Sequence, residues 1–499
     1  MKSKRIRFGT GLTAALVALA LLAVCGSGAT PENSGEASGQ GGTGASGLYP
    51  VVSGPSDQTG ETVSGASVPS GDVGTEGTTG NSGVTATSSS ATAPSPKGTT
   101  AVPPAGKVNP EDYRGTTVRF ATWKDPNQNE DGPVVAAFKK KYGIDVKIDV
   151  VPQDSYTMDI SGKIAAGNQP DVYFDNGFFP ASLAVLQPLE AARLDLTDPI
   201  WDQGMLKKST VGGKPYLVNT VGNIWSEVDC VFYNKKLLQD NNITTPEEYY
   251  KAGKWTFEAM TKVMSDVAKL GPDYIGGYLD LDAMMGCVGT SFYKFEDGKF
   301  TNGTSDAMLT SVLQYISTSI KDGLVKGIYY VNRDDFKKGK MGIAVTNAFG
   351  MKKTGYWKGM NPSHIGYTYL PNWDAGTKAK QTGLFRGWGL VKGAKNPVGA
   401  GIFLRYYLDV NNYDVSTAFL DQDAENFFFK LTSGNTQDKF SGMMIGATEY
   451  LGYNRNKFYE IASGDPAQIS KEVAALKNVV DGHATKLNKL LTDQANLYK

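Results

Sequence analysis

The segment from Val118 to Asn176 constrains the fold most, because strand and helix patterns alternate along it. Three short runs are typical of β-strands: 117–121, 146–150 and 170–174. Between them, apolar residues recur every four positions, as on one face of a helix, at Val134, Phe138 and Tyr142 and again at Tyr156, Ile160 and Ile164. We therefore predict a βαβαβ unit, which implies right-handed crossovers and a parallel sheet.

The residues that follow the first and third runs are the first candidates for a binding site. In open sheets of this type, ligands bind beyond the carboxyl ends of the strands. The candidates at those ends are Trp123, Lys124, Asp125, Asp175, Asn176 and Phe178. Two alternatives stay open: a core position for Trp123, and a turn or helix cap for Asp175.

The amino terminus is predicted to be a lipoprotein-type signal peptide, residues 1–25. Basic residues precede an apolar run, 12–24, that is too short to span a bilayer. The run ends in Leu22-Ala23-Val24-Cys25, which resembles a lipobox, although Val24 stands where that pattern has a small residue. We expect a lipid on Cys25 and a protein anchored to the outer face of the cytoplasmic membrane. The alternative is an ordinary secretory signal with Cys25 incidental.

Residues 26–110 are dominated by Gly, Ser, Thr, Ala and Pro, a composition that predicts a disordered tether. Over the whole chain, Lys plus Arg equals Asp plus Glu at 50 each, so no net charge favours nucleic acid. Besides Cys25 there are only Cys230 and Cys287, which could form a disulfide in an exported protein or be small buried apolar residues.

Eight local patterns then occur in a characteristic order, at 138–146, 164–172, 213–216, 232–235, 254–258, 339–344, 369–371 and 395–397. Each is weak alone, but together they resemble the extracellular solute-binding proteins of bacterial ABC importers, the group that includes the maltose-binding protein. The segment after Val410 matches only as amphipathic helices.

The resemblance implies an α/β fold of the two-lobe periplasmic-binding-protein type (type II-like), with parallel-rich sheets flanked by helices and hinge strands between the lobes. The first lobe would be 111–229 plus 372–409, and the second 230–371 plus 410–499. It also implies a monomer without a cofactor, which closes on a small solute and presents it to the permease subunits.

A sugar site needs flat aromatic faces for the C–H groups and polar side chains for the hydroxyls. By position in the family pattern, the further ligand-binding candidates are Trp225, Glu227, Asn347, Phe349, Arg386 and Trp388. The most favoured ligand is therefore a carbohydrate or oligosaccharide. A non-sugar solute such as a peptide or metal complex, or a role in feeding a sensor kinase, is the alternative.

Catalysis is the remote alternative. The only histidines are His364 and His483, and neither a Gly-x-Ser-x-Gly elbow nor a His-Glu-x-x-His motif is present, so triad and zincin chemistries lack their parts. A secreted glycosidase, which needs only two carboxylates, stays open. The acidic loop 125–131 lacks the glycine and the final glutamate of a calcium loop, so we predict no metal site there.

Overall fold

The computed structural model describes residues 108–128, 131–152, 155–221, 228–328, 333–414, 417–433 and 443–498, together with the backbone of 439–440. The predictions for the signal peptide, Cys25, nearly all of the tether, Trp225 and Glu227 lie outside these residues. No helix in the described ranges combines the length and the apolar character needed to cross a membrane.

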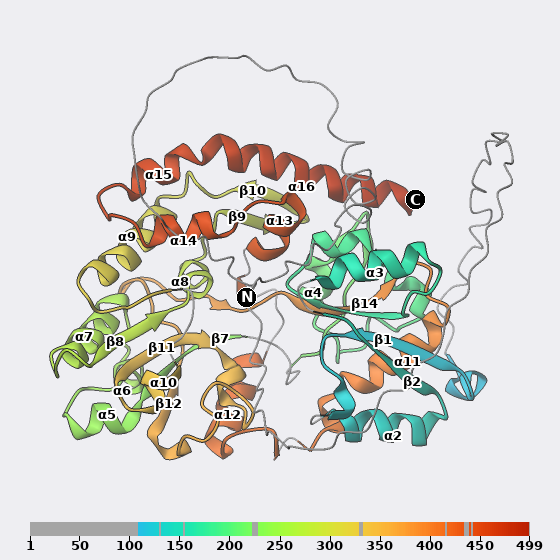
Figure 1. Cartoon of the computed structure of the whole chain (residues 1–499), viewed down its shortest axis with the longest axis horizontal. Coiled ribbons are helices and arrows are strands. Elements are labelled where there is room, and N and C mark those ends of the chain that lie inside the picture. Colours follow the sequence, from blue (N-terminus) through green and yellow to red (C-terminus); the bar gives the residue numbers. More distant parts are fainter. Residues whose placement is uncertain are drawn as a thin grey trace, which may run out of the picture. The chain divides into compact units, whose positions relative to one another are not determined.

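The first sheet has the strand order β2-β1-β3-β14-β4 and contains the predicted βαβαβ unit (Figure 1). Strand β1 (Thr117–Thr122) pairs in parallel with β2 (Asp145–Val150) and with β3 (Val172–Asn176). The crossovers are α2 (Gly132–Tyr142), which ends at Gly143 with a φ of 64°, and α3 (Tyr156–Ala165). A positive φ is easily adopted only by glycine, which explains this helix end. The predicted unit is confirmed.

A later part of the chain completes the first sheet. Strand β14 (Arg386–Val391) runs antiparallel to both β3 and β4 (Leu186–Gln187). Helix α11 (Pro397–Tyr407) then packs on β1 and α2, where Phe403 contacts the rings of Phe120 and Phe138. The other elements near this sheet are η1 (Pro110–Tyr113), η2 (Pro126–Gln128), η4 (Ala181–Ala184), η5 (Leu189–Ala192), α4 (Gln203–Lys208), β5 (Thr210–Val211) and β6 (Lys214–Pro215).

The second sheet has the order β12-β7-β11-β8. Strands β11 (Met341–Asn347) and β8 (Ile275–Leu279) are parallel, whereas β7 (Asp229–Asn234) runs antiparallel to both β11 and β12 (Ile365–Thr368). This sheet is therefore mixed rather than parallel-rich. The chain enters this sheet along β7 and leaves it along the neighbouring strand β12. Because it enters and leaves at the same end of the sheet, these two strands run in opposite directions.

Amphipathic helices cover the second sheet. In α7 (Phe257–Ala268), Thr256 accepts a hydrogen bond from the Ala259 N–H at 3.2 Å, and the apolar stripe that includes Met260 and Val263 is buried. The remaining elements of this part are α5 (Lys235–Asp240), α6 (Pro246–Lys251), α8 (Leu281–Cys287), β9 (Tyr293–Glu296), β10 (Lys299–Asn302), α9 (Ala307–Lys321), α10 (Arg333–Lys337), η6 (Ala348–Met351) and η7 (Pro362–His364).

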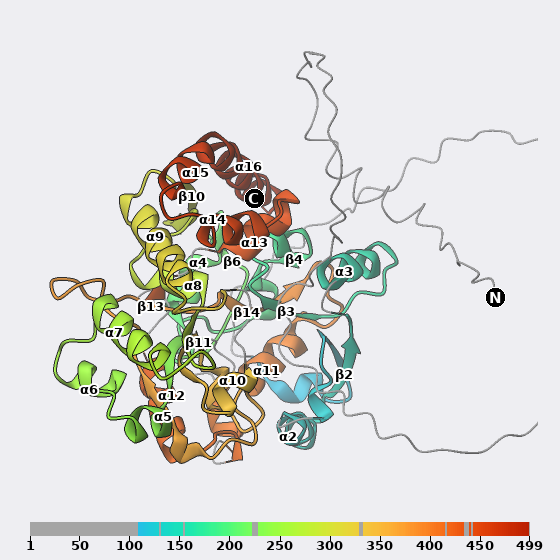
Figure 2. The ribbon, with the colours of Figure 1, turned by 60° about the vertical axis from the view of Figure 1, so that its left-hand side comes forward.

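The chain ends in a group of helices that we call the C-terminal helices: α13 (Met444–Leu451), α14 (Asn456–Ala462), α15 (Ile469–Ala475) and α16 (Lys477–Leu497) (Figure 2). Helices are therefore found after Val410, as the sequence indicates, and a turn at Leu476 separates α15 from α16. Before them come β13 (Gln381–Thr382), η8 (Val410–Asn412), α12 (Gln422–Thr432) and β15 (Lys439–Phe440).

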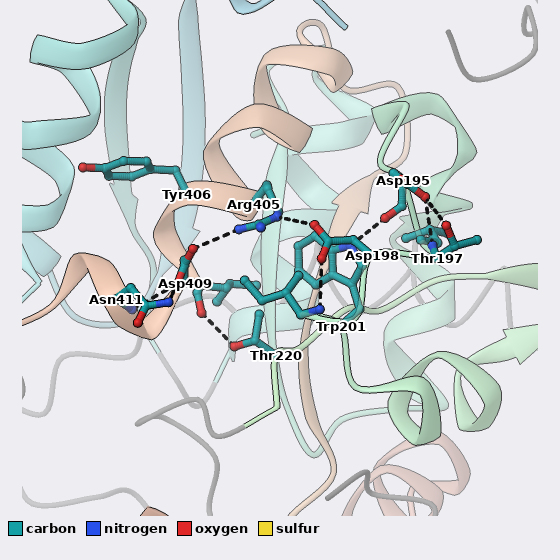
Figure 3. Close-up of polar contacts among 12 residues, drawn as sticks. Asp195, Thr197, Asp198, Trp201, Thr220, Arg405, Tyr406, Asp409 and Asn411 are labelled. Atoms are coloured by element: carbon teal, nitrogen blue, oxygen red, sulfur yellow. Dashed lines mark hydrogen bonds and ion pairs between the residues drawn. The ribbon is translucent and has the colours of Figure 1, made fainter. Parts of the chain in front are cut away.

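A polar network fixes the passage from α11 to η8 (Figure 3). Arg405 donates to Asp198 at 2.9 Å and to Asp409 at 3.1 Å, and the Asp409 carboxylate also accepts the Asn411 N–H at 3.0 Å. The Thr220 hydroxyl donates to the Leu408 carbonyl at 2.7 Å. Up to Asn411, this passage is therefore held by hydrogen bonds to Asp198 and Thr220, in loops next to the first sheet. Beyond it, α12 packs on η6, next to the second sheet.

Candidate functional site

Three aromatic rings lie across the carboxyl ends of β1 and β3 and the start of β14. The Trp123 and Phe174 ring centroids are 4.7 Å apart with an interplanar angle of 30°, and those of Phe174 and Trp388 are also 4.7 Å apart, at 22°. Phe174 therefore lies between two indoles. Such offset stacking is favourable beyond the area it buries.

Strand register places these rings together. Trp388 is the direct antiparallel partner of Phe174, so the two side chains emerge on the same face of the sheet. Trp388 is only 2% exposed, while Trp123 is half-buried and packs edge-on against Tyr156 at 5.6 Å. Trp123 and the rim of Phe174 are thus the accessible parts of the stack, and Trp388 supports them from within.

A cation and an amide accompany the rings. The Arg386 Nε donates to the Asn176 Oδ1, and the guanidinium lies 5.4 Å from the centroid of Phe174. Both side chains are half-buried. The structure therefore brings four of the predicted residues, Trp123, Asn176, Arg386 and Trp388, to one edge of the first sheet.

The other candidates on this edge have structural contacts. Asp175 has no exposed surface, and its Oδ1 accepts backbone N–H groups from Gly177 and Phe178 at 3.0 Å and from Phe179 at 3.3 Å. Burial raises the pKa of its carboxyl to about 6, against the lowering by these hydrogen bonds. This geometry is that of the turn cap given above as the alternative, and Phe178 is buried beside it.

The loop after β1 is similar. Asp125 accepts the Asn127 N–H at 2.9 Å, as a cap of the short helix η2, and Lys124 is exposed. Ligand contacts by Lys124, Asp125, Asp175 and Phe178 stay predictions, and the contacts seen here give Asp125 and Asp175 a local structural role.

A second edge lies at the carboxyl ends of β8 and β11. These strands are parallel, so Asn347, the last residue of β11, and Asp280, the residue after β8, lie at one edge. The Asn347 Oδ1 accepts from the Phe349 N–H at 3.1 Å and from the Tyr356 hydroxyl at 3.0 Å. The Phe349 and Tyr356 rings are in edge contact at 5.3 Å. Both predicted residues of this edge are half-buried.

Carboxylates and cations surround this second edge. Asp280 caps α8 by accepting the Ala283 N–H at 3.0 Å. Loss of surrounding water, then the charge of Asp280, raises the pKa of Asp282 to about 7, which Arg455 partly opposes. Arg455 in turn lies 5.7 Å from the Tyr459 ring centroid, and Arg333 lies 4.7 Å from that of Tyr356.

The family of the chain follows from comparison with known protein families. Residues 134–414 match the family model of bacterial extracellular solute-binding proteins, which covers more than half of the chain. The chain is a bacterial extracellular solute-binding protein. The predicted family is therefore confirmed, and with it export from the cytoplasm.

Solved structures share the fold of this solute-binding protein. The lacto-N-biose-binding protein of Bifidobacterium longum has a TM-score of 0.54 at 15% identity, covering 76% of this chain and 98% of that one. The binding protein of B. animalis subsp. lactis in complex with β-1,6-galactobiose has a TM-score of 0.52 at 17% identity, over 74% and 98%. That of Thermotoga lettingae with α-D-tagatose has 0.51 at 16%, over 75% and 99%. Comparison with curated proteins gives no match. The predicted two-lobe α/β architecture is confirmed.

Several residues of the two edges of this solute-binding protein were missed from the sequence. Phe174 was assigned only to a strand, although the alternation of β3 could have placed it on the face of Trp388. Tyr356, Arg455 and Tyr459 reach the second edge from loops and C-terminal helices, where no local pattern indicates it. Within the described ranges, no cluster of His, Cys, Asp and Glu could hold a metal ion, and Cys230 and Cys287 are buried free thiols.

Proposed function

We propose that this solute-binding protein captures a carbohydrate or oligosaccharide between its two lobes and delivers it to the permease of an ABC importer, without catalysis. The observation that carries the proposal is the stack of Trp123, Phe174 and Trp388 beside Arg386 and Asn176. A sugar ring has apolar C–H faces and a rim of hydroxyls, and this edge offers an aromatic surface with a cation and an amide next to it.

In this proposal the two edges have complementary tasks. The first lobe, 111–229 plus 372–409, supplies the aromatic surface. The second lobe, 230–371 plus 410–499, supplies Asn347, the carboxyls of Asp280 and Asp282, and the tyrosines near them. Closing of the lobes around the solute converts occupancy into a shape that a permease can recognise. Trp225 and Glu227 fall next to the first hinge in the family pattern and are proposed as further contacts.

The anchoring part of the proposal rests on the sequence. Cys25 would carry the lipid, and residues 26–110 would let a monomeric binding protein reach the permease from the outer face of the cytoplasmic membrane. Radiolabelled fatty acid should be incorporated into the wild-type chain and lost in Cys25→Ala. Incorporation that persists in the variant would reject this site of attachment.

Isothermal titration calorimetry with a panel of di- and oligosaccharides tests the ligand class. We expect heat with at least one sugar, and a loss of about 1–3 kcal/mol of binding free energy in Trp123→Ala, as for other buried aromatic anchors. Trp373→Ala is the control, because this half-buried ring packs on Phe257 at 4.8 Å and on Tyr315 at 6.5 Å rather than on the aromatic stack.

Two outcomes would contradict the proposal. Heat with peptides and none with any sugar would move the ligand to the non-sugar alternative. Release of reducing sugar from a bound oligosaccharide would instead identify a glycosidase. Equal affinities of Trp123→Ala and Trp373→Ala would remove the aromatic stack from the site while leaving the ligand class intact.

A further inference from the structure

Three arginines outside the candidate site pair with carboxylates. In each case a guanidinium nitrogen lies within ion-pair distance of an acidic side chain: Arg114 with Glu111 at 2.9 Å, Arg119 with Asp149 at 2.5 Å and Arg405 with Asp198 at 2.9 Å. Arginine suits such pairs because its planar group matches the geometry of a carboxylate. These arginines therefore have structural partners within the chain.

The arginines at the two edges of the candidate site lie over aromatic rings instead. The distance from the guanidinium carbon to the ring centroid is 4.7 Å for Arg333 and Tyr356, 5.4 Å for Arg386 and Phe174, and 5.7 Å for Arg455 and Tyr459. All three arginines are half-buried. Positive charge is therefore concentrated around the place where the solute is proposed to bind.

Away from the site, lysine makes this kind of contact. The Lys340 Nζ lies 4.3 Å from the Tyr274 ring centroid, and the Lys141 Nζ lies 5.1 Å from that of Tyr142. A cation–ring contact in this protein thus does not require arginine. Arginine differs because its face covers the ring while its N–H groups, which lie in the plane of the guanidinium, can bind a second partner.

The acidic side chains of the second edge are already engaged. Asp280 accepts the Ala283 N–H at 3.0 Å. Burial, followed by the charge of Asp280, raises the pKa of Asp282, and the charge of Arg455 opposes this rise. Arg455 therefore acts on a carboxyl of its own edge, and the cation of this edge that is left without a counter-charge is Arg333.

Arg333 has no carboxylate partner in the part of the chain that the structure describes. Its neighbours on α10, Asp334 and Asp335, form no ion pair with it. A half-buried arginine is normally paired, because burial removes water from its charge. The environment of Arg333 therefore indicates a partner that does not belong to the chain.

The ring beneath Arg333 is fixed at the second edge. The Tyr356 hydroxyl donates to the Asn347 Oδ1 at 3.0 Å, and the Tyr356 ring makes an edge contact with Phe349 at 5.3 Å. Both partners are ligand-binding candidates from the sequence. A guanidinium held in this way is suited to paired hydrogen bonds with a carboxylate, sulfate or phosphate group.

We propose that the solute of this binding protein is an acidic carbohydrate and that Arg333 binds its anionic group. The inference rests on the proposed function, because it refines the ligand of the same site. A neutral sugar leaves the guanidinium without a counter-charge, whereas a uronic acid, or a sugar that carries sulfate or phosphate, supplies one.

Calorimetry with matched pairs of ligands tests the inference. Each pair is a neutral disaccharide and its uronic acid counterpart, in the gluco, galacto and manno series, and sulfated and phosphorylated sugars of the same series separate a carboxylate from the other anions. We expect at least one acidic member to bind roughly 10- to 100-fold more tightly than its neutral counterpart, the range of charge-assisted hydrogen bonds. Raising NaCl from about 20 to about 500 mM should reduce this preference, because salt screens the charges.

Two variants and a control assign the effect to Arg333. Arg333→Gln should lower the preference for the acidic member by about tenfold or more, and should change the affinity for the neutral member by less than about twofold. Arg333→Lys should keep part of the preference, because an ammonium keeps the charge without the planar pair of donors. Arg193→Gln is the control and should bind like the parent: Arg193 is half-buried after η5, which packs at the end of β14 opposite Arg386.

The salt dependence is measured on the parent chain, so the test stays decisive if a variant fails to fold. Acidic members that bind no more tightly than neutral ones, or an unchanged preference in Arg333→Gln, would overturn the inference. Binding of the neutral members would then leave the proposed function intact. Heat with acidic peptides alone, lost in Arg333→Gln, would reject the carbohydrate and support Arg333 as the contact for an anion.

Discussion

The two edges of the candidate site are built in different ways. On the first lobe, neighbouring strands hold Trp123, Phe174 and Trp388 in a stack, and the rings have few alternative positions. On the second lobe, tyrosines and charged side chains arrive from a strand end, a loop and α14, and they include the longer side chains of Arg333 and Arg455. We infer that the first edge provides a general surface for sugar rings, whereas the second selects among hydroxyl patterns.

The strongest way to break this comparison is to remove the middle ring. Phe174→Ala should lower the free energy of unfolding by about 3 kcal/mol, because the rings of Trp123 and Trp388 lose their shared partner. Urea denaturation measures this change. Phe349→Ala on the second edge is the matched control and should cost clearly less, since its ring has one edge contact with Tyr356. Equal losses would show that the two edges are equally dependent on packing.

The buried carboxyl of Asp175 on the first edge should make the stability of the protein depend on pH. Its pKa is raised from 3.8 to about 6, so the folded state holds this proton more tightly than the unfolded state does. The protonated carboxyl therefore stabilises the folded state most below pH 3.8. About 3 kcal/mol of this stabilisation is lost as the pH rises to about 6.

Thermal or urea unfolding at several pH values measures this effect in Asp175→Asn, which cannot titrate. The difference in stability between the variant and the parent should increase in favour of the variant from about pH 4 to about pH 6 and then stay constant. A difference that does not change with pH would show that the carboxyl is not held protonated by its burial.

The smallest effect is expected on the second edge. With a pKa of about 7, Asp282 gains charge as the pH passes neutrality, and a charged carboxylate is the stronger acceptor of ligand hydroxyls. Sugar affinity should therefore rise by less than about tenfold between pH 6 and pH 8, the range of one charge-assisted hydrogen bond. Asp282→Asn should flatten this profile in calorimetry. A profile that is unchanged in the variant would assign the pH dependence to another group.

Sequence reasoning succeeded for those elements whose pattern is contained in a few neighbouring residues. Periodicity placed α2, α3 and the three strands around them, because each pattern is local. The rule that ligands bind at carboxyl ends then brought Trp123 and Asn176 together, and the family resemblance added Arg386 and Trp388 from far along the chain.

The failures have a common physical cause. Whether Asp175 faces a solute or caps a turn depends on where the N–H groups of the next residues point, which the sequence does not state. The place of Arg455 and Tyr459 depends on how the C-terminal helices pack. Such packing is decided by contacts between residues more than 100 positions apart in the chain, for example between the Phe292 and Phe458 rings.

The clamp formed by Arg405 has a mechanical consequence. Arg405 forms hydrogen bonds with both Asp198 and Asp409. The stretch up to Asn411 is therefore fixed to the lobe that contains the aromatic rings. In this connection between the two sheets, a movement of the second sheet would therefore bend the backbone after Asn411 and not before it. A neutral side chain in place of Arg405 would release Asp198 and Asp409 and let this connection bend closer to α11.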